Sequence, residues 1–247
     1  MNFFSLFKRK LIYSLRKKIN IDIDNFEEKS LDALFHHYGS DKANVFKINN
    51  STGHGFSKFY DKYFNQIKNK NINILEIGSY AGASAAAFVK FLPNTKVYCF
   101  DINISNYKYA SKNIEVYGID VNNEKKVEKL LNKIFLKKNF KGFDCIIDDG
   151  SHNLSDILFS LNFFFKHLKS RGFYIIEDYK HPNYYSYNKN INHILIDELL
   201  VKFKNKEYFS SDYITSEEQN SLFNSIKEIS TYKGNLKDSD ICFIEKN

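Results

Sequence analysis

An apolar run that ends in glycine decides the fold of this chain. It reads Ile72-Asn73-Ile74-Leu75-Glu76-Ile77-Gly78-Ser79-Tyr80-Ala81-Gly82. Residues 72–77 have the length and composition of a buried strand, and the small residues of 81–91 are typical of a closely packed helix. The two glycines let the backbone approach a ligand closely, and the helix that follows offers free N–H groups. The stretch predicts the first strand, turn and helix of an α/β domain.

The same alternation continues along the chain. Further strands are predicted at 96–102, 114–118, 143–148 and 172–177, and helices at 124–135 and 154–168. Strands that alternate with helices indicate a parallel sheet covered on both faces. Two later apolar segments, 226–233 and 241–245, are separated by a polar turn and predict an antiparallel hairpin. The expected fold class is therefore α/β, Rossmann-like, mostly parallel, with an antiparallel C-terminal hairpin and an N-terminal helical segment.

Length and charge limit the classes of protein to consider. The chain has 247 residues, 43% hydrophobic and 26% charged, which fits one α/β domain with an appendage. The net charge is +7, but residues 1–20 carry six bases and no acid, so the rest of the chain is nearly balanced. A nucleic-acid-binding domain usually has its basic patch on the folded body, so no nucleic-acid partner is expected.

The three cysteines and the apolar segments indicate the compartment. Cys99, Cys145 and Cys242 each lie inside an apolar run, which predicts buried free thiols rather than disulfides or a metal cluster. No apolar run approaches the roughly 20 residues of a membrane span, and the N-terminus lacks the features of a secretory signal. We expect a cytoplasmic protein, with peripheral contact at the inner face of the membrane left open by the N-terminal segment.

That segment predicts a basic amphipathic helix. One stripe of residues 3–19 is apolar at helical spacing, and bases lie on the opposite side or flank it. Two interpretations stay open: the helix packs on its own domain with its basic face solvated, or it lies on an anionic membrane surface. The stripe comprises Phe4, Phe7, Leu11, Leu15 and Ile19.

A carboxylate closes the second predicted strand. Asp101 follows Glu76 by 25 residues, where an acid can accept hydrogen bonds from both ribose hydroxyls of a nucleoside-bearing cofactor. The turn is not the G-x-G-x-x-G fingerprint, because Tyr80 and Ala83 stand where glycines are expected. The glycine turn and Asp101 together predict a cofactor that contains a nucleoside.

Acidic residues also follow two strands that should be neighbours in the sheet. Asp149 comes after the strand 143–148, and Glu177 and Asp178 come after the next strand along the chain. Three oxygen ligands without cysteine suit Mg²⁺, or else Mn²⁺ or Ca²⁺, and a bound cation would relieve the repulsion among them. His152 lies three residues beyond Asp149 and can reach the same space as a general base.

These motifs resemble those of a known group of enzymes. Leu75–Gly82, Asp101, Asp148–His152 and Glu177-Asp178 are similar to the metal-dependent class I methyltransferases of natural-product and surface-sugar pathways. Within this group the motifs resemble the macrolide-sugar O-methyltransferases and the cephalosporin-hydroxylase-like family, and the resemblance covers about residues 30–245. Two upstream motifs, Tyr38–Lys42 and His54–Phe56, also resemble the entry motif of the group.

The resemblance implies a seven-stranded sheet with an antiparallel last strand, and specific roles for the motif residues. The metal ligands would be Asp149, Glu177 and Asp178, and His152 would deprotonate the acceptor hydroxyl. Asp120 departs from the pattern, because relatives often have Gly-Asp-Gln where this chain has Gly118-Ile119-Asp120. The loop 179–190 carries no pattern that names the acceptor. Residues implied to bind S-adenosylmethionine are Glu76, Gly78, Gly82, Asp101, Asp120, Ser40, Lys42 and His54.

The expected function is methyl transfer from S-adenosylmethionine to a hydroxyl of a sugar or similar small molecule, assisted by Mg²⁺. Expected segments are a helix at 1–20, a helical cap at 21–70 and the cofactor-binding domain at 71–247. One alternative is a Rossmann nucleotide-sugar dehydrogenase or epimerase, for which a different glycine pattern is expected. The other is a non-enzymatic membrane- or nucleic-acid-associated protein. A homo-oligomer stays open.

Overall fold

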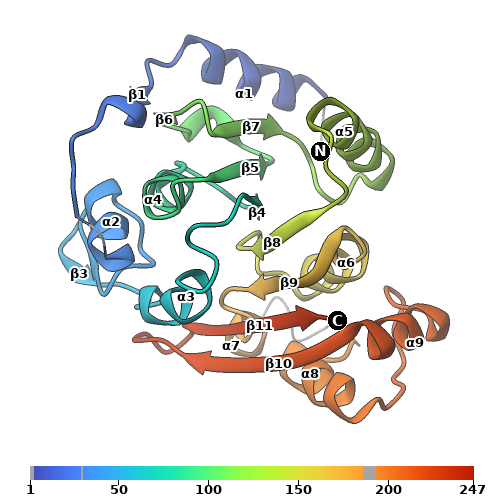
Figure 1. The fold of residues 1–247 in the computed structure, drawn as a ribbon. Helices are drawn as coiled ribbons and strands as arrows, with labels where there is room; N and C mark the ends of the chain where they lie inside the picture. The colour runs from blue at the N-terminus through green and yellow to red at the C-terminus, as the bar shows by residue number, and fades with distance from the viewer. Residues whose placement is uncertain (1–2, 29, 186–192) are drawn as a thin grey trace. The chain divides into compact units, whose positions relative to one another are not determined.

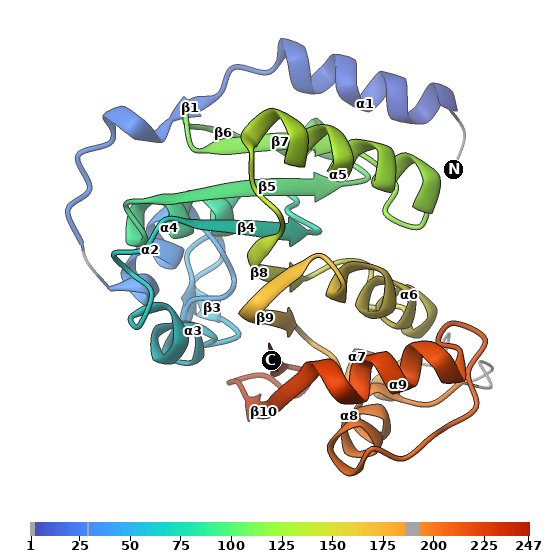
Figure 2. The ribbon, with the colours of Figure 1, turned by 45° about the vertical axis from the view of Figure 1, so that its right-hand side comes forward.

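The computed structural model describes residues 3–28, 30–185 and 193–247, and the chain divides into two compact units (Figures 1 and 2). The first unit contains residues 1–127 with 234–237, and the second contains 128–233 with 238–247. The expected segments 1–20 and 21–70 both fall in the first unit, and the division into three segments stays a prediction.

The first unit begins with helices and short strands before the glycine turn. Its elements are α1 (Phe3–Leu15), β1 (Ile19–Asn20), η1 (Ile21–Ile23), α2 (Leu31–Tyr38), β2 (Val45–Phe46), β3 (Ser51–Thr52), α3 (Ser57–Phe64), β4 (Ile72–Ile77), α4 (Ala83–Phe91), β5 (Thr95–Asp101), η2 (Ile104–Asn106), β6 (Tyr109–Ala110) and β7 (Ile114–Gly118). Helix α5 (Glu124–Lys138) contains the boundary between the units.

The second unit contains the remaining strands and helices. They are β8 (Phe143–Asp148), α6 (Leu154–Phe165), β9 (Leu168–Ile176), α7 (His181–Tyr184), α8 (Ile196–Asn205), α9 (Ser216–Ser225), β10 (Ile226–Lys233) and β11 (Asp240–Lys246). Helix α7 lies within the predicted loop 179–190, whose residues 186–190 fall outside the described part of the chain.

The strand pairings confirm the expected fold class. In the first unit β4 pairs with β5 and β5 with β7, all parallel. In the second unit β8 and β9 are parallel, whereas β11 is antiparallel to both β9 and β10. All seven strands belong to one mixed sheet. The core strands are buried along most of their length, as the nearly continuous apolar runs require.

The glycine turn after β4 needs its glycines for space as well as for conformation. Gly78 and Gly82 have φ angles of 85° and 78°, in the left-handed region that residues with a Cβ rarely adopt. A Cβ at Gly82 would come within 2.3 Å of the Tyr107 ring, which is itself fully buried. The turn can therefore close over Tyr107 only with glycine at position 82.

One predicted boundary is wrong. The helix expected at 154–168 ends at Phe165, and the strand expected at 172–177 begins at Leu168. The early half of β9 pairs with the start of β8, and the register shifts before the two strands continue together. The apolar residues of this segment are compatible with either a helix or a strand, so periodicity alone could not locate the point where α6 ends and β9 begins.

Helix α1 docks on the first unit, but not through its apolar stripe. Arg9 Nη1 donates a hydrogen bond to the carbonyl oxygen of Ile102 at 3.0 Å, and the Tyr13 ring meets Tyr107 edge-on at 6.2 Å. Figures 1 and 2 both show α1 lying along β7. The opposite face stays exposed, at 60% for Phe7, 49% for Leu11 and 78% for Leu15. The interpretation in which the apolar stripe packs on the domain is wrong.

The burial of the cysteines and the lengths of the helices agree with the predictions from the sequence. Cys99, Cys145 and Cys242 are all buried and form no disulfide within the described part of the chain, and burial raises the pKa of the Cys242 thiol to about 12. Among the described residues, no helix combines the length and the apolar character needed to cross a bilayer.

His167 makes the second unit sensitive to acid. Burial among aromatic rings lowers its pKa to about 4, and its buried Nε2 has no hydrogen-bond partner among the described residues. The unfolded chain binds this proton near pH 6.5, so stability falls as the pH drops from about 6.5 to 4. We expect a loss of about 1–2 kcal/mol, reduced for partial exposure. In urea unfolding at both pH values, His167→Phe should remove this loss and the exposed His36→Gln should keep it. Equal acid sensitivity in both variants would contradict the assignment.

Candidate functional site

A buried acid stabilises the turn after β4. Glu76 is fully buried, and its carboxylate accepts a hydrogen bond from the Ser84 hydroxyl in the first turn of α4. Gly82 begins α4 without any side-chain cap, so the first N–H groups of the helix remain available to a ligand. Glu76 therefore holds the turn in place, and its contact with a cofactor stays a prediction.

Asp101 fixes the same turn from the end of β5. Its Oδ2 accepts the backbone N–H of Tyr80 at 2.7 Å, and its Oδ1 accepts that of Asn103 at 2.5 Å. Tyr80 has a φ of 42°, so the carboxylate holds a residue in the left-handed region. Each oxygen keeps a second lone pair that can accept a ribose hydroxyl.

A cavity of about 600 Å³ opens beside the turn within the first unit. It is lined by α2 and the residues after it, the β2–β3 loop, the turn after β4, and Lys108 with Tyr109. Ser40 and Lys42 line it and are both buried, so the structure brings two of the predicted cofactor residues against Ser79–Ser84. The lining mixes apolar and polar side chains, and its charged residues are three lysines and one aspartate, which suits a ligand with a carboxylate.

The other predicted cofactor residues do not line this cavity. His54 donates its backbone N–H to the carbonyl oxygen of Asp41 at 2.7 Å, and its ring lies 3.9 Å from the Asp41 carboxylate. Asp120 follows β7 and accepts the N–H of Asn122 at 3.2 Å, which shapes its own loop. Binding of cofactor by these residues stays a prediction.

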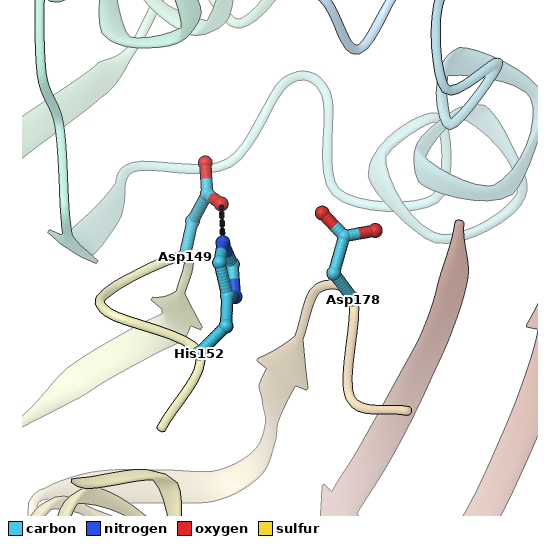
Figure 3. Close-up of side chains that lie close together, drawn as sticks. All are labelled: Asp149, His152 and Asp178. Atoms are coloured by element: carbon cyan, nitrogen blue, oxygen red, sulfur yellow. Dashed lines mark ion pairs between the residues drawn. The ribbon is translucent and has the colours of Figure 1, made fainter. Parts of the chain in front are cut away.

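In the second unit, three predicted side chains gather where β8 and β9 end (Figure 3). Asp149, His152 and Asp178 each offer one ligand atom, and these atoms lie within 4.8 Å of one another. His152 Nε2 is 3.6 Å from Asp149 Oδ1, and Figure 3 shows the Asp178 carboxylate turned toward the same space. Residues 26 to 29 positions apart meet here because parallel neighbouring strands end at one edge of the sheet.

The backbone of this cluster is strained. His152 and Asp178 have φ angles of 56° and 50°, a conformation that costs residues with a Cβ of the order of 1 kcal/mol each. Such conformations persist only where the surrounding structure imposes them, and they are common in functional sites. The strain therefore supports a functional role for both residues.

A third aspartate, the buried Asp148, directly precedes Asp149 at the end of β8. Burial and the neighbouring Asp149 charge raise the pKa of Asp148 to about 7, while the Gly150 N–H and the Tyr174 hydroxyl oppose that rise. Tyr174 Oη donates to Asp148 Oδ2 at 3.3 Å. Asp148 thus anchors the loop that carries Asp149 and His152.

Glu177 has a different position from that of the other two predicted metal ligands. It is 1% exposed, and its backbone N–H donates to the Asp148 carbonyl oxygen at 3.0 Å, which continues the pairing of β8 with β9. The group of potential ligands that the structure brings together contains Asp149, His152 and Asp178 but not Glu177. A ligand role for Glu177 stays a prediction.

Sequence reasoning missed His181. Its ring lies 5.2 Å from that of His152 and stacks on Tyr185 at 3.9 Å, and burial followed by the neighbouring His152 lowers its pKa. A signal was present in the spacing, because Asp178 and His181 repeat the three-residue interval of Asp149 and His152. The irregular, tyrosine-rich composition of 179–190 concealed it.

The donor set of the cluster fits a hard divalent cation. Two carboxylates and one imidazole within 4.8 Å can bind Mg²⁺ or Mn²⁺, with water completing the coordination shell. Alternatively, His152 can stay free of the metal and accept a proton, since only oxygen ligands are needed to hold Mg²⁺. The arrangement can therefore polarise and deprotonate a hydroxyl group.

Comparison with known proteins agrees with this geometry. Residues 75–179 match a protein family described as a methyltransferase domain. Mycinamicin VI 2''-O-methyltransferase of Micromonospora griseorubida is 27% identical over 132 residues, which cover 51% of this chain and 31% of that protein. L-olivosyl-oleandolide 3-O-methyltransferase of Streptomyces antibioticus is 28% identical over 162 residues, covering 62% and 38%. The matched region thus spans about a third of these curated relatives.

Solved structures show the same fold. MycE, a methyltransferase from the mycinamycin biosynthetic pathway solved with Mg, SAH and mycinamycin VI, has a TM-score of 0.65 and 20% identity, covering 89% of this chain and 55% of that one. An O-methyltransferase from Bacillus cereus solved with SAH has a TM-score of 0.51 and 12% identity, covering 92% and 94%. The predicted resemblance to macrolide-sugar O-methyltransferases is confirmed.

Proposed function

We propose that this methyltransferase domain transfers a methyl group from S-adenosylmethionine to a hydroxyl of a sugar or similar polar metabolite, in natural-product or surface-polysaccharide biosynthesis. The observation that carries the proposal is the convergence of Asp149, His152 and Asp178 at the strand ends. The names of the curated relatives, which are O-methyltransferases of macrolide sugars, support the choice of a sugar acceptor. The match over 75–179 favours this function over a dehydrogenase, an epimerase or a binding protein.

The first unit would bind the cofactor. Asp101 would take the ribose hydroxyls with its remaining lone pairs, and the open first turn of α4 would lie near the cofactor, close to Ser40 and Lys42. S-adenosylmethionine supplies a methyl group on a sulfonium, which is already a good leaving group. The remaining work of this chain is to orient the acceptor and to activate its hydroxyl.

The second unit would activate the acceptor. Asp149 and Asp178 would hold the divalent cation, with Glu177 as a further proposed ligand, and a bound cation lowers the pKa of a coordinated hydroxyl. His152 would accept the hydroxyl proton at Nε2, which lies 3.6 Å from Asp149 Oδ1, so the carboxylate would stabilise the imidazolium that forms. Loss of the proton leaves the acceptor oxygen with the electron pair that forms the new bond to the methyl carbon.

The function is tested by incubating the full chain with methyl-labelled S-adenosylmethionine and a panel of free, nucleotide-linked and lipid-linked sugars. Release of S-adenosylhomocysteine together with label in the acceptor would support the proposal, and label on oxygen can be assigned by NMR. Tight binding of a nicotinamide dinucleotide, without binding of S-adenosylhomocysteine, would overturn it in favour of a dehydrogenase.

Removal of the Asp101 carboxylate should weaken cofactor binding. We expect Asp101→Asn to weaken the binding free energy of S-adenosylhomocysteine by about 1.5–3 kcal/mol, because a charge-assisted hydrogen bond is lost. The asparagine oxygen can still accept one of the two backbone N–H groups, which limits damage to the turn. Calorimetry with a 2′-deoxy analogue is the control, since a ribose contact predicts a much smaller loss for that ligand. An equal loss for both ligands would reduce Asp101 to a structural role.

A further inference from the structure

Helix α1 has two opposite faces, and only one of them contacts the rest of the first unit. Arg9 and Tyr13 make the docking contacts, whereas Phe7, Leu11 and Leu15 lie one turn apart on the outer face. At 100° per residue, the centre of this outer row lies about 180° from the docking face. Three large apolar side chains in one exposed row are costly in water, so the row is suited to burial against a partner.

Positive charge lies on both sides of this row. Lys8 and Lys10 flank it and are exposed, and Arg16 and Lys17 follow the helix. Residues 1–20 contain six bases and no acid. An apolar row flanked by basic residues is typical of helices that lie in the interface of an anionic bilayer, where lysine side chains extend toward the headgroups.

We propose that the outer face of α1 binds an anionic lipid surface. Phe7, Leu11 and Leu15 enter the boundary between headgroups and acyl chains, and Lys8 contacts the headgroups. A second copy of the chain is a poorer occupant, because symmetric pairing through this face would bring two segments with six positive charges together. The inference rests on α1 alone and holds whether or not the chain transfers methyl groups.

Sedimentation of the full chain with vesicles tests this surface. We expect binding to vesicles of phosphatidylcholine with phosphatidylserine, little binding to phosphatidylcholine alone, and loss of binding in high salt. Leu11→Ser with Leu15→Ser should weaken binding by roughly ten-fold or more, since buried apolar area is lost. Leu136→Ser is the matched control, because Leu136 is 84% exposed on α5 beside Lys133 and Lys137. An equal effect of the control would show that binding does not depend on the apolar row of α1 and would overturn the proposal.

The absence of tryptophan from the chain permits a site-specific reporter. With Leu15→Trp, fluorescence emission should shift to shorter wavelength on addition of anionic vesicles, whereas Leu136→Trp should show no shift. Sedimentation without a shift at position 15 would place the lipid contact elsewhere and overturn the proposal. A dimer in light scattering that Leu11→Ser with Leu15→Ser converts to monomer would also overturn it, in favour of a second copy.

Discussion

Methyl transfer by this chain is expected to stop in EDTA and to return when Mg²⁺ is added. Asp149 and Asp178 present carboxylate oxygens to one space, and a cation held there would lower the pKa of the acceptor hydroxyl. Without the cation His152 must take the proton from a hydroxyl whose pKa is not lowered, which should cost several kcal/mol, or roughly a thousand-fold in rate. The measurement is initial rate of S-adenosylhomocysteine formation after chelation and after addition of Mg²⁺, Mn²⁺ or Ca²⁺.

Asp149→Ala should reproduce the effect of chelation and resist rescue by Mg²⁺. The matched control is Asp144→Ala, which removes a carboxylate from the opposite end of β8, where it pairs with Lys169 at 2.8 Å. The control should keep full activity and full sensitivity to EDTA. Circular dichroism and S-adenosylhomocysteine affinity should confirm that both variants fold. Full activity in EDTA, with no metal retained by the protein, would disprove the metal mechanism and leave base catalysis alone.

His152→Ala should retain cofactor and metal binding but lose roughly 10²–10⁴ in kcat, the usual contribution of a positioned general base. The residual activity should rise with pH, because hydroxide can replace the missing imidazole. His152→Asn should give a similar loss, and asparagine tolerates the left-handed backbone at this position better than alanine does. Agreement between the two variants would therefore exclude a purely conformational cause.

The matched control for His152 is His193→Ala. His193 also faces a carboxylate, that of Asp212 at 3.9 Å, but lies outside the group formed by Asp149, His152 and Asp178. Its removal should leave the rate and its pH dependence unchanged. A fully active His152→Ala enzyme would remove the base assignment without affecting the metal prediction, so the two experiments separate the two roles.

The sequence predicted the site to the extent that strand ends determine it. Asp149 and Asp178 could be brought together because each follows an apolar run, and parallel strands end at the same edge. The inward position of Glu177 could not be predicted in this way, since adjacent residues after a strand point in different directions. His181 was missed because its position depends on the short helix α7, whose tyrosine-rich sequence has no apolar period.

The orientation of α1 illustrates a second limit. Amphipathic spacing showed that one face is apolar, but not which face the protein itself uses. Arg9 docks through a hydrogen bond to Ile102, and Tyr13 docks through the Tyr107 ring, so both contacts depend on tertiary partners far along the chain. Similarly, the change from α6 to β9 depends on pairing with β8, which apolar residues alone do not specify.

The left-handed backbone of His152 and Asp178 bears on protein engineering. Glycine adopts this conformation without the steric cost that both residues bear, so replacing either one would tend to raise the melting temperature. A library screened only for heat resistance would therefore enrich glycine at both positions and discard the proposed base and one proposed metal ligand. Selection for a more durable catalyst from this scaffold has to score turnover in every round.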